Sequence, residues 1–199
     1  MHVPEAQKTT IGILGRLAPS SQGNNLTDLL ALSHFSQNGS GALFSALRTE
    51  QRVSYGFQAG FFDYNRKNRL LIITGVVVAD QAADVAADIA EIHEEYRLDP
   101  NFETLPDLQN GMVNQTQKNV GYVNIAARTI LELAVDKRDP KIALKLHNKL
   151  AKLHSQDLKS RMKTVFPPKS ELAVFAAGPS KKGWSDACVI SKIEALDEC

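Results

Sequence analysis

The sequence has few cysteines, no long hydrophobic run and almost no net charge. No apolar stretch approaches the roughly 20 residues that a membrane-spanning helix needs, so no span is expected. The net charge of +1 gives no long-range field that would attract nucleic acid or an anionic membrane. The first ten residues, MHVPEAQKTT, lack the basic and apolar regions of a signal peptide, and none is expected here.

The two cysteines, Cys188 and Cys199, both lie near the C-terminus. Two cysteines are too few to decide between an oxidising and a reducing compartment. A disulfide between them is one alternative, and two unpaired thiols are the simpler expectation.

The histidines do not form a zinc-peptidase motif. Such a motif needs two histidines one helical turn apart and a glutamate, in the order HExxH or HxxEH. His93-Glu94 comes nearest, but Arg97 stands where the second histidine should be, so this stretch is predicted to be a solvated helix end. His147 and His154 lie seven positions apart, too far for one tetrahedral metal without further ligands, and are predicted to be surface residues. The other two histidines are His2 and His34.

Other catalytic motifs are also missing from the sequence. It contains no G-x-S-x-G nucleophile elbow, and neither cysteine has a neighbouring histidine. The short Gly39-Ser40-Gly41 segment lacks the lysine of a phosphate-binding P-loop, and Gly12 with Gly15 is not a dinucleotide fingerprint. The sequence therefore predicts no catalytic site of its own.

What the sequence does contain is typical of one globular domain. Its 199 residues are 43% hydrophobic and 23% charged, which is ordinary for a protein with a substantial core. We find no internal repeat and no low-complexity linker, so a single domain covering residues 1–199 is the simplest interpretation.

The pattern of apolar residues and turn signals predicts an α+β fold. Strands are expected where β-branched and apolar residues cluster, and helices where apolar residues recur every three to four positions. The expected strands are 8–17, 54–62, 69–78 and 171–179, and the expected helices are 28–37, 42–51, 80–97, 107–120, 122–137 and 141–166. Ser155 is expected to begin a separate helix within the last range. The order of these elements favours one mainly antiparallel sheet with helices packed against it.

The stretch LFSALRTEQRVSYGFQA, residues 43–59, is the most informative part of the chain. Arg48 lies at the end of the expected helix, where its guanidinium could bind a carboxylate or a peptide carbonyl. Tyr55 lies at the start of the next strand and could offer its hydroxyl to the same opening. The structural alternatives are a salt bridge or helix-dipole role for Arg48 and a half-buried position in the sheet for Tyr55.

This stretch resembles the C-terminal, non-catalytic half of pitrilysin/insulinase-type zinc metallopeptidases, in which "LF..LRE....Y" precedes a core strand. The small residues 39–42 before Leu43 fit that pattern, and the resemblance extends over roughly residues 8–179. It differs at Gln51–Ser54, where the family has a glycine before the strand, so Arg52 is an alternative to Arg48. The resemblance implies the LuxS/pitrilysin type of metallopeptidase fold, with Arg48 and Tyr55 contacting the substrate backbone.

The resemblance also implies partners and a location. A catalytic HxxEH domain, on the same or a separate chain, would carry the zinc, and this chain would complete the chamber that holds the peptide substrate. No cofactor is expected on this chain, and no activity from it alone. Bacterial two-domain members imply a periplasmic or other extracytoplasmic location. Two alternatives remain: a non-proteolytic scaffold or assembly subunit of the same fold, and an unrelated small binding protein.

Overall fold

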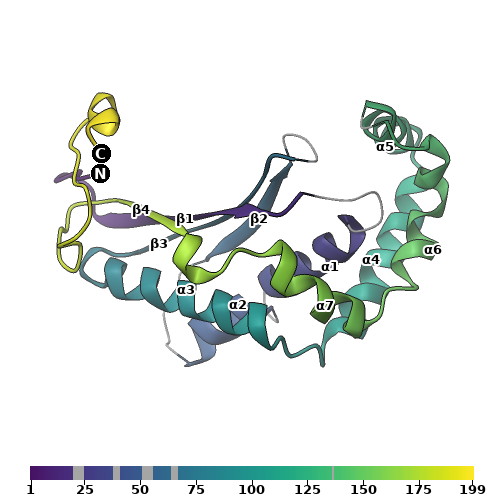
Figure 1. Ribbon diagram of the computed structural model, residues 1–199, viewed down its shortest axis with the longest axis horizontal. Helices are drawn as coiled ribbons and strands as arrows, with labels where there is room; N and C mark the ends of the chain where they lie inside the picture. The colour runs from purple at the N-terminus through teal and green to yellow at the C-terminus, as the bar shows by residue number, and fades with distance from the viewer. Residues whose placement is uncertain (20–24, 38–40, 51–55, 64–66, 136) are drawn as a thin grey trace.

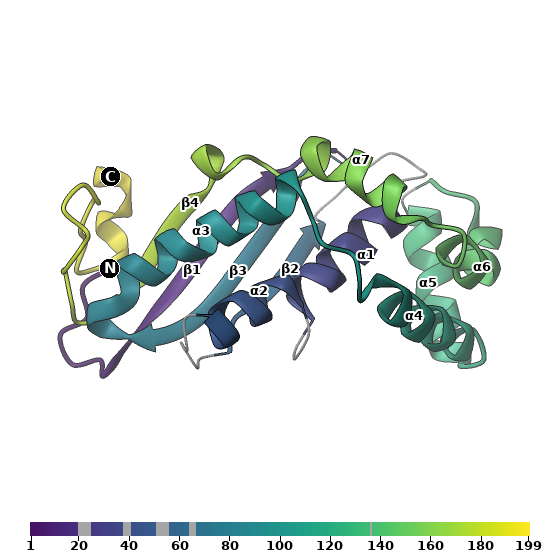
Figure 2. The ribbon, with the colours of Figure 1, turned by 90° about the horizontal axis from the view of Figure 1, so that it is seen from below.

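The computed structural model describes residues 1–19, 25–37, 41–50, 56–63, 67–135 and 137–199. Its centre is a four-stranded antiparallel sheet in the order β2-β3-β1-β4 (Figures 1 and 2). The strands are β1 (Lys8–Leu17), β2 (Gln58–Asp63), β3 (Arg69–Val78) and β4 (Ala173–Ala177). The α+β class with an antiparallel sheet is thus confirmed.

Helices lie against one face of this sheet and in an arm beside it. Three elements that cover or adjoin the sheet are α1 (Asn25–Ser36), α3 (Ala82–Leu98) and α7 (Ser155–Val165). A short helix α2 (Ala42–Phe44) continues into the π-helical segment η1 (Ser45–Glu50). The arm contains α4 (Leu105–Val120), α5 (Val123–Val135), the 3₁₀ segment η3 (Pro140–Lys145) and α6 (Leu146–Leu150). The remaining 3₁₀ segments are η2 (Ala79–Gln81), η4 (Lys169–Glu171) and η5 (Ile193–Glu198).

The core lies between the sheet and the helices beneath it. Because successive strand residues point to opposite faces, every second residue of β1 and β3 points into this core. Ile11, Ile13, Leu71 and Ile73 are fully buried there. Helix α3 lies along β1 and β3 in Figure 2 and contributes Ile89 to the same cluster.

The predicted strands 8–17 and 69–78 match β1 and β3 residue for residue. The strand predicted over 54–62 corresponds to β2, which begins at Gln58. Positions 54 and 55 lie outside the described residues. The expected break near Gly121 separates α4 from α5, and Ser155 does begin α7. The long helix predicted over 141–166 is wrong in its first half, where η3 and α6 replace it.

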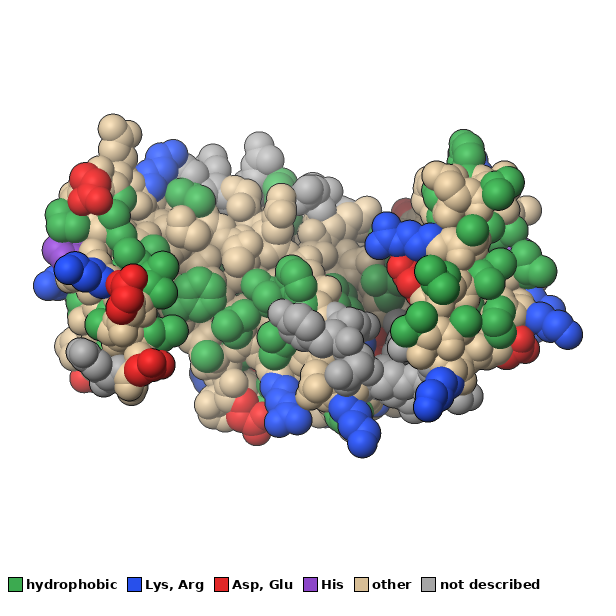
Figure 3. Space-filling model, turned by 90° about the horizontal axis from the view of Figure 1, so that it is seen from above, with side chains coloured by type: hydrophobic (Ala, Val, Ile, Leu, Met, Phe, Trp, Pro, Cys, Tyr) green, Lys and Arg blue, Asp and Glu red, His purple; other side chains and the backbone are tan. Residues whose placement is uncertain are grey.

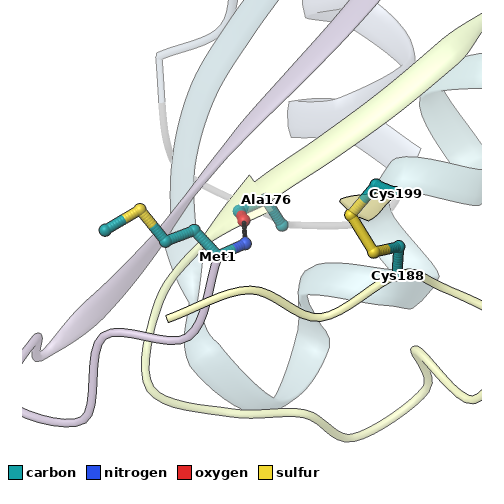
Figure 4. The surroundings of a disulfide bond; sticks show 4 residues. All are labelled: Met1, Ala176, Cys188 and Cys199. Carbon is teal, nitrogen blue, oxygen red and sulfur yellow. Dashed lines mark hydrogen bonds between the residues drawn. A yellow bond between two sulfur atoms is a disulfide. The ribbon is translucent and has the colours of Figure 1, made fainter. Parts of the chain in front are cut away.

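The prediction that Cys188 and Cys199 are unpaired thiols is wrong. The short helix η5 turns the tail back, so that the two Cα atoms lie 5.7 Å apart and the sulfurs form a disulfide (Figure 4). The N-terminus lies beside this tail, with the amide of His2 donating to the carbonyl of Ile190 at 2.7 Å. The α-amino group of Met1 donates to the carbonyl of Ala176 in β4 (Figure 4). Both termini are therefore held at one end of the sheet (Figure 1).

Within the described ranges, none of the helices combines the length and the apolar character needed to cross a membrane.

Candidate functional site

The segment that joins α2 to β2 carries the two residues singled out by the sequence. Arg48 lies in η1, but its side chain is outside the described residues, and so is the whole of Tyr55. The roles predicted for these two residues therefore stay predictions.

The described residues on either side of the segment are anchored in the core. Leu43 and Leu47 are buried on the helical side. On the strand side Phe57 is buried, and its ring lies over Gly75 of β3, where a Cβ would come within 2.3 Å of it. Side chains alternate between the two faces of the sheet here, since Phe57, Ala59 and Phe61 are all less exposed than Gln58 and Phe62. The segment is thus held at both ends by packing.

A glycine fixes how the chain enters α2. The amide of Gly41 donates to the carbonyl of Gln37 at 2.7 Å, which holds Gly41 against the end of α1. A Cβ at Gly41 would lie 2.5 Å from the Gln37 nitrogen and 2.8 Å from the Phe35 oxygen. Both are backbone atoms, so the clash cannot be relieved by a side-chain rotation.

Replacing Gly41 by alanine should therefore destabilise the fold, by about 1–3 kcal/mol as in other overpacked sites. Denaturant unfolding followed by circular dichroism measures this loss. Gly60→Ala is the matched control, because a Cβ at Gly60 would meet no described atom within 4 Å. This substitution should be neutral or slightly stabilising. Equal stability of Gly41→Ala and the parent chain would show that the backbone atoms around Gly41 are not closely packed.

A cavity of about 410 Å³ opens beside the η1 segment. One wall comes from Ser45 and Ala46, which precede Arg48 on the same turn, and another from Ile92 and Tyr96 of α3. The loop after α3 completes it. The other lining residues are His34, Ala42, Glu95, Asp99, Pro100, Asn101, Glu103 and Thr104.

His34 forms the polar floor of this cavity. It is only 3% exposed, and both ring nitrogens have partners: the Tyr96 hydroxyl lies 3.0 Å from Nδ1 and the Thr104 hydroxyl 3.1 Å from Nε2. The Tyr96 hydroxyl donates to the Ala31 carbonyl at 3.0 Å, so it must accept from Nδ1–H. Nε2 then accepts from Thr104.

The environment of this network keeps it neutral. Burial lowers the pKa of His34 below its ordinary 6.5 and raises the pKa of Tyr96 above its ordinary 10.0. A neutral imidazole with both nitrogens occupied cannot serve as a general base without breaking a hydrogen bond. The network therefore shapes the cavity and does not suit catalysis.

Three carboxylates line the cavity: Glu95, Asp99 and Glu103. Asp99 also faces Lys159 of α7, whose amine lies 3.7 Å from it. Carboxylates beside an apolar wall and a hydroxyl can hold a cationic or hydrogen-bonding group. The described residues of this cavity could therefore bind a small cationic or hydrogen-bonding group.

The prediction that His93 lies on a solvated helix end is wrong. His93 is 1% exposed and lies between the rings of Phe35 and Phe166. Its position follows from helical spacing, because His93 comes four residues after the buried Ile89 and therefore shares its face.

The carboxylate of the neighbouring Glu94 is occupied by hydrogen bonds. Arg97 donates to both of its carboxylate oxygens, at 2.9 and 2.6 Å, and the Lys169 amide donates to one of them at 3.1 Å. The Arg97 hydrogen bond is the main reason that the pKa of Glu94 falls to about 2. His93 and Glu94 therefore do not act as a zinc ligand and water-activating base, and this stretch does not fit a metal.

The other histidines do not meet to form a site. His154 is exposed, as predicted, and precedes α7, where its amide donates to Asp157 at 2.8 Å. His147 is half-buried instead of exposed, and its Nδ1 has no hydrogen-bond partner in the described part of the chain. Among the described residues, no three His, Cys, Asp or Glu side chains are grouped so that they could hold a metal ion.

Sequence reasoning missed the cavity and its histidine. The available signal was that His34 follows Leu30 and Ala31 at helical spacing and precedes Phe35, which places it on the buried face of α1. Its partners Tyr96 and Thr104 are 62 and 70 residues away in sequence. No local pattern could connect them.

Comparison with known proteins gives a match in structure and none in sequence. No protein-family model matches the chain, and neither does any curated protein sequence. The peptidase M16 inactive domain from Pseudomonas fluorescens superimposes with a TM-score of 0.76 at 12% identity, over 92% of this chain and 43% of that one. A putative zinc protease from Bordetella pertussis Tohama I gives 0.72 at 12% identity, over 88% of this chain and 96% of that one.

A third similar structure is the periplasmic protease PqqL from Escherichia coli, with a TM-score of 0.72 at 15% identity over 88% of this chain and 20% of that one. The chain thus spans less than half of the Pseudomonas and Escherichia proteins and nearly all of the Bordetella one. At these identities the likeness concerns the fold. The chain has the fold of the inactive domain of M16 zinc peptidases, as the resemblance to the pitrilysin/insulinase type predicts.

Proposed function

We propose that this chain is the non-catalytic, substrate-binding half of a pitrilysin-like zinc endopeptidase. The observation that carries the proposal is the structural match of 86–92% of the chain to two inactive peptidase domains, in a sequence that contains no HxxEH motif. The zinc and its activated water would come from a partner domain. This chain would complete the chamber around the peptide.

Arg48 and Tyr55 are the residues proposed to contact the peptide near the zinc of the partner. The packing of Leu43, Leu47 and Phe57 supports this proposal, because a segment anchored at both ends can hold a guanidinium and a phenol in position. Donors fixed in advance at the site of developing charge favour the transition state over the bound substrate.

The proposed unit is a single inactive domain of a longer two-domain protein or one subunit of a pair. Support comes from similar structures of both kinds, since the chain matches 43% of the Pseudomonas chain and 96% of the Bordetella chain. In either case the catalytic domain is a required partner.

We place the protein in the periplasm or another extracytoplasmic compartment. The Cys188–Cys199 disulfide supports this location, because disulfides persist in oxidising compartments and are rare in the reducing cytosol. The similar Escherichia coli protein PqqL is described as periplasmic.

A scaffold role is the second candidate. A chain in the complex III₂ structure from Candida albicans has the same fold, with a TM-score of 0.67 at 10% identity over 92% of this chain and 46% of that one. Under this alternative the chain would be a structural subunit of an assembly, and that assembly would not need to cleave peptides.

Reconstitution tests the peptidase proposal. The chain is mixed with separately produced HxxEH domains encoded in the same genome, and cleavage of a quenched fluorescent peptide is followed. We expect neither component to cleave alone and one mixture to do so. Arg48→Ala and Tyr55→Phe should each reduce kcat/KM at least tenfold, as when an oxyanion donor is removed.

Arg52→Ala is the matched control, because it removes an arginine from the same segment and should leave the rate unchanged. An unaltered kcat/KM in Arg48→Ala would refute the proposal that Arg48 contacts the substrate. A reduced kcat/KM in Arg52→Ala would indicate that Arg52 makes this contact instead. Stable assembly with an HxxEH domain but no cleavage would favour the scaffold.

A further inference from the structure

The chain that follows β4 is anchored beside η2 and the start of α3. We call residues 179–199 the tail. The Ser180 hydroxyl donates to a carboxylate oxygen of Asp80 at 2.9 Å. Gly183 lies so close to α3 that a Cβ there would come within 2.5 Å of an alanine side chain. Trp184 comes next and packs, partly buried, against the core. The first part of the tail is therefore held in place by packing and by a hydrogen bond.

The second part of the tail has little packing of its own. Its apolar side chains Val189, Ile193 and Leu196 are 45%, 70% and 61% exposed. In the described part of the chain, the backbone hydrogen bonds of η5 join residues of the tail to one another. Figure 3 shows this end of the molecule on the left, with charged and hydrophobic side chains at its surface. The Cys188–Cys199 disulfide joins the two ends of this part and closes it into a loop.

A short segment at the start of the chain lies between the tail and β4. We call residues 1–3 the N-terminal strip. On one side the strip pairs with Gly178, just after β4, in a parallel bridge. On the other side the amide of His2 donates to the carbonyl of Ile190 in the tail at 2.7 Å. Figure 4 shows Met1 and the disulfide at this same end of the sheet. The strip is therefore held from two sides, and one of them is the tail.

The disulfide lies where a dissolved reductant can reach it. Both Cys188 and Cys199 are exposed, and neither belongs to the buried core. A thiolate must approach a sulfur atom to exchange with a disulfide, so exposed disulfides are the labile and regulatory ones. The two cysteines are only 11 positions apart, so the bond closes a short loop. Breaking the bond therefore frees residues 189–199 and leaves the sheet and its helices intact.

We propose that the Cys188–Cys199 disulfide is a redox-sensitive clasp, opened by a dithiol reductant, that controls the order of the tail and of the N-terminal strip. One thiolate of the reductant attacks a sulfur of the disulfide and forms a mixed disulfide, which the second thiol of the reductant then resolves. Two electrons and two protons pass to the two cysteines, which become thiols. The reductant leaves as a disulfide.

Opening the clasp changes the N-terminal strip through one hydrogen bond. The reduced tail keeps its anchor at Trp184 and loses its fixed end. Ile190 comes two positions after Cys188, so its carbonyl moves when the loop opens, and the amide of His2 loses its partner. The strip then keeps only its pairing with the end of β4, and a three-residue segment held on one side frays readily. This inference requires only the chain itself and does not depend on the peptidase proposal.

Limited trypsin digestion of the purified chain, with and without dithiothreitol, tests the clasp. Lys192 is exposed inside the loop, and a protease cuts such a segment only when it opens locally. We expect reduction to speed cleavage after Lys192 by about tenfold or more. The fluorescence of Trp184, the only tryptophan, and the circular dichroism of the chain should stay unchanged. The anchored part of the tail and the sheet do not depend on the bond.

The reactivity of the α-amino group tests the link to the N-terminal strip. This group belongs to Met1 and donates to the carbonyl of Ala176 in the folded chain. Reduction should raise its rate of acylation by about fivefold, as expected for the loss of one hydrogen bond. Lys145 is the internal control, because it is exposed at the end of η3 in the arm, and its rate of acylation should stay constant.

A variant without the two thiols separates the effect of the bond from that of the reagent. The double variant Cys188→Ser, Cys199→Ser should be cleaved as fast as the reduced parent, and dithiothreitol should change its rate no further. Ser191→Ala is the matched control, because it lies in the same loop and keeps the disulfide. Its cleavage should stay slow until dithiothreitol is added.

Four results would each overturn the proposal. They are a disulfide that dithiothreitol does not reduce in the folded chain, equal cleavage after Lys192 in both states, an unchanged reactivity of the α-amino group, and loss of the whole fold on reduction. The last result would make the bond a staple of the entire domain and not a local clasp. None of these measurements involves a partner domain or the cleavage of a substrate peptide, so they are independent of the peptidase proposal.

Discussion

Replacing Asp28 by alanine should destabilise the chain by about 3–5 kcal/mol, because it removes the carboxylate that pairs with the buried Arg69 and the half-buried Arg161. Asp28 is fully buried in α1. It accepts from Arg69 of β3 at 2.8 Å and from the Nε of Arg161 in α7 at 2.8 Å. Arg69 is itself only 1% exposed, so water cannot replace the lost carboxylate. Urea unfolding measures the loss.

Two variants separate charge from packing in this experiment. Asp28→Asn keeps the shape and hydrogen-bond acceptor of the side chain, so it should cost less than alanine. Glu132→Ala removes the exposed pair with Arg128 on α5, where the side chains are 61% and 80% exposed. It should change stability by at most about 0.5 kcal/mol. If Asp28→Ala costs no more than Glu132→Ala, the buried cluster does not stabilise the fold.

The Asp28 cluster also shows where sequence reasoning stops. Strands β1 and β3 were predicted to the residue, because clusters of β-branched and apolar residues next to turn residues are a local signal. The partners of Asp28 are 41 and 133 residues away in sequence, and only the packed fold brings them together. Local patterns contain no information about such pairings.

The errors have physical causes of the same kind. The sequence 141–166 has the composition of a helix, and the turn at residues 151–154 divides it because Leu150 and Leu158 both pack into the core. The disulfide forms because η5 folds the tail back, which the spacing of Cys188 and Cys199 does not reveal. In each case tertiary structure overrides a local expectation.

In the candidate site, too, the local sequence predicts some features and only the packed fold reveals the others. The fold behind it could be recognised from residues 43–59, because the closely packed Gly41 before that stretch and the buried Leu47 and Phe57 within it are structural requirements of the segment. The cavity next to it could not, since its floor joins α1, α3 and the loop before α4. Substrate contact at Arg48 and Tyr55 remains a prediction for the reconstitution experiment to test.

Acid should weaken this protein through His93, whose environment disfavours the charged imidazole. Burial lowers the pKa of His93 from 6.5 to about 4, an effect that Arg97 reinforces and Glu94 opposes. Between these two values the unfolded chain binds a proton that the folded chain does not. Stability that is complete above pH 6.5 is therefore lost as the pH falls toward 4, by about 3 kcal/mol at 1.36 kcal/mol per pKa unit.

The variant His93→Leu should remove this part of the pH dependence. It should also be at least as stable as the parent near neutral pH, because both ring nitrogens of His93 are buried and have no hydrogen-bond partner among the residues that the structure describes. Urea unfolding at about pH 7, 5.5 and 4 measures both effects, since these values span the two pKa values of the imidazole. Carboxylates and His34 titrate in both proteins, so the difference between parent and variant isolates His93.

His93→Gln separates charge from polarity in the same experiment. It cannot take up a proton, so it should flatten the pH dependence as leucine does. It still buries polar atoms between Phe35 and Phe166, so it should not share the gain at neutral pH. If the parent and both variants lose stability equally on acidification, then His93 accepts its proton in the folded chain without penalty, and its burial does not govern the response to acid.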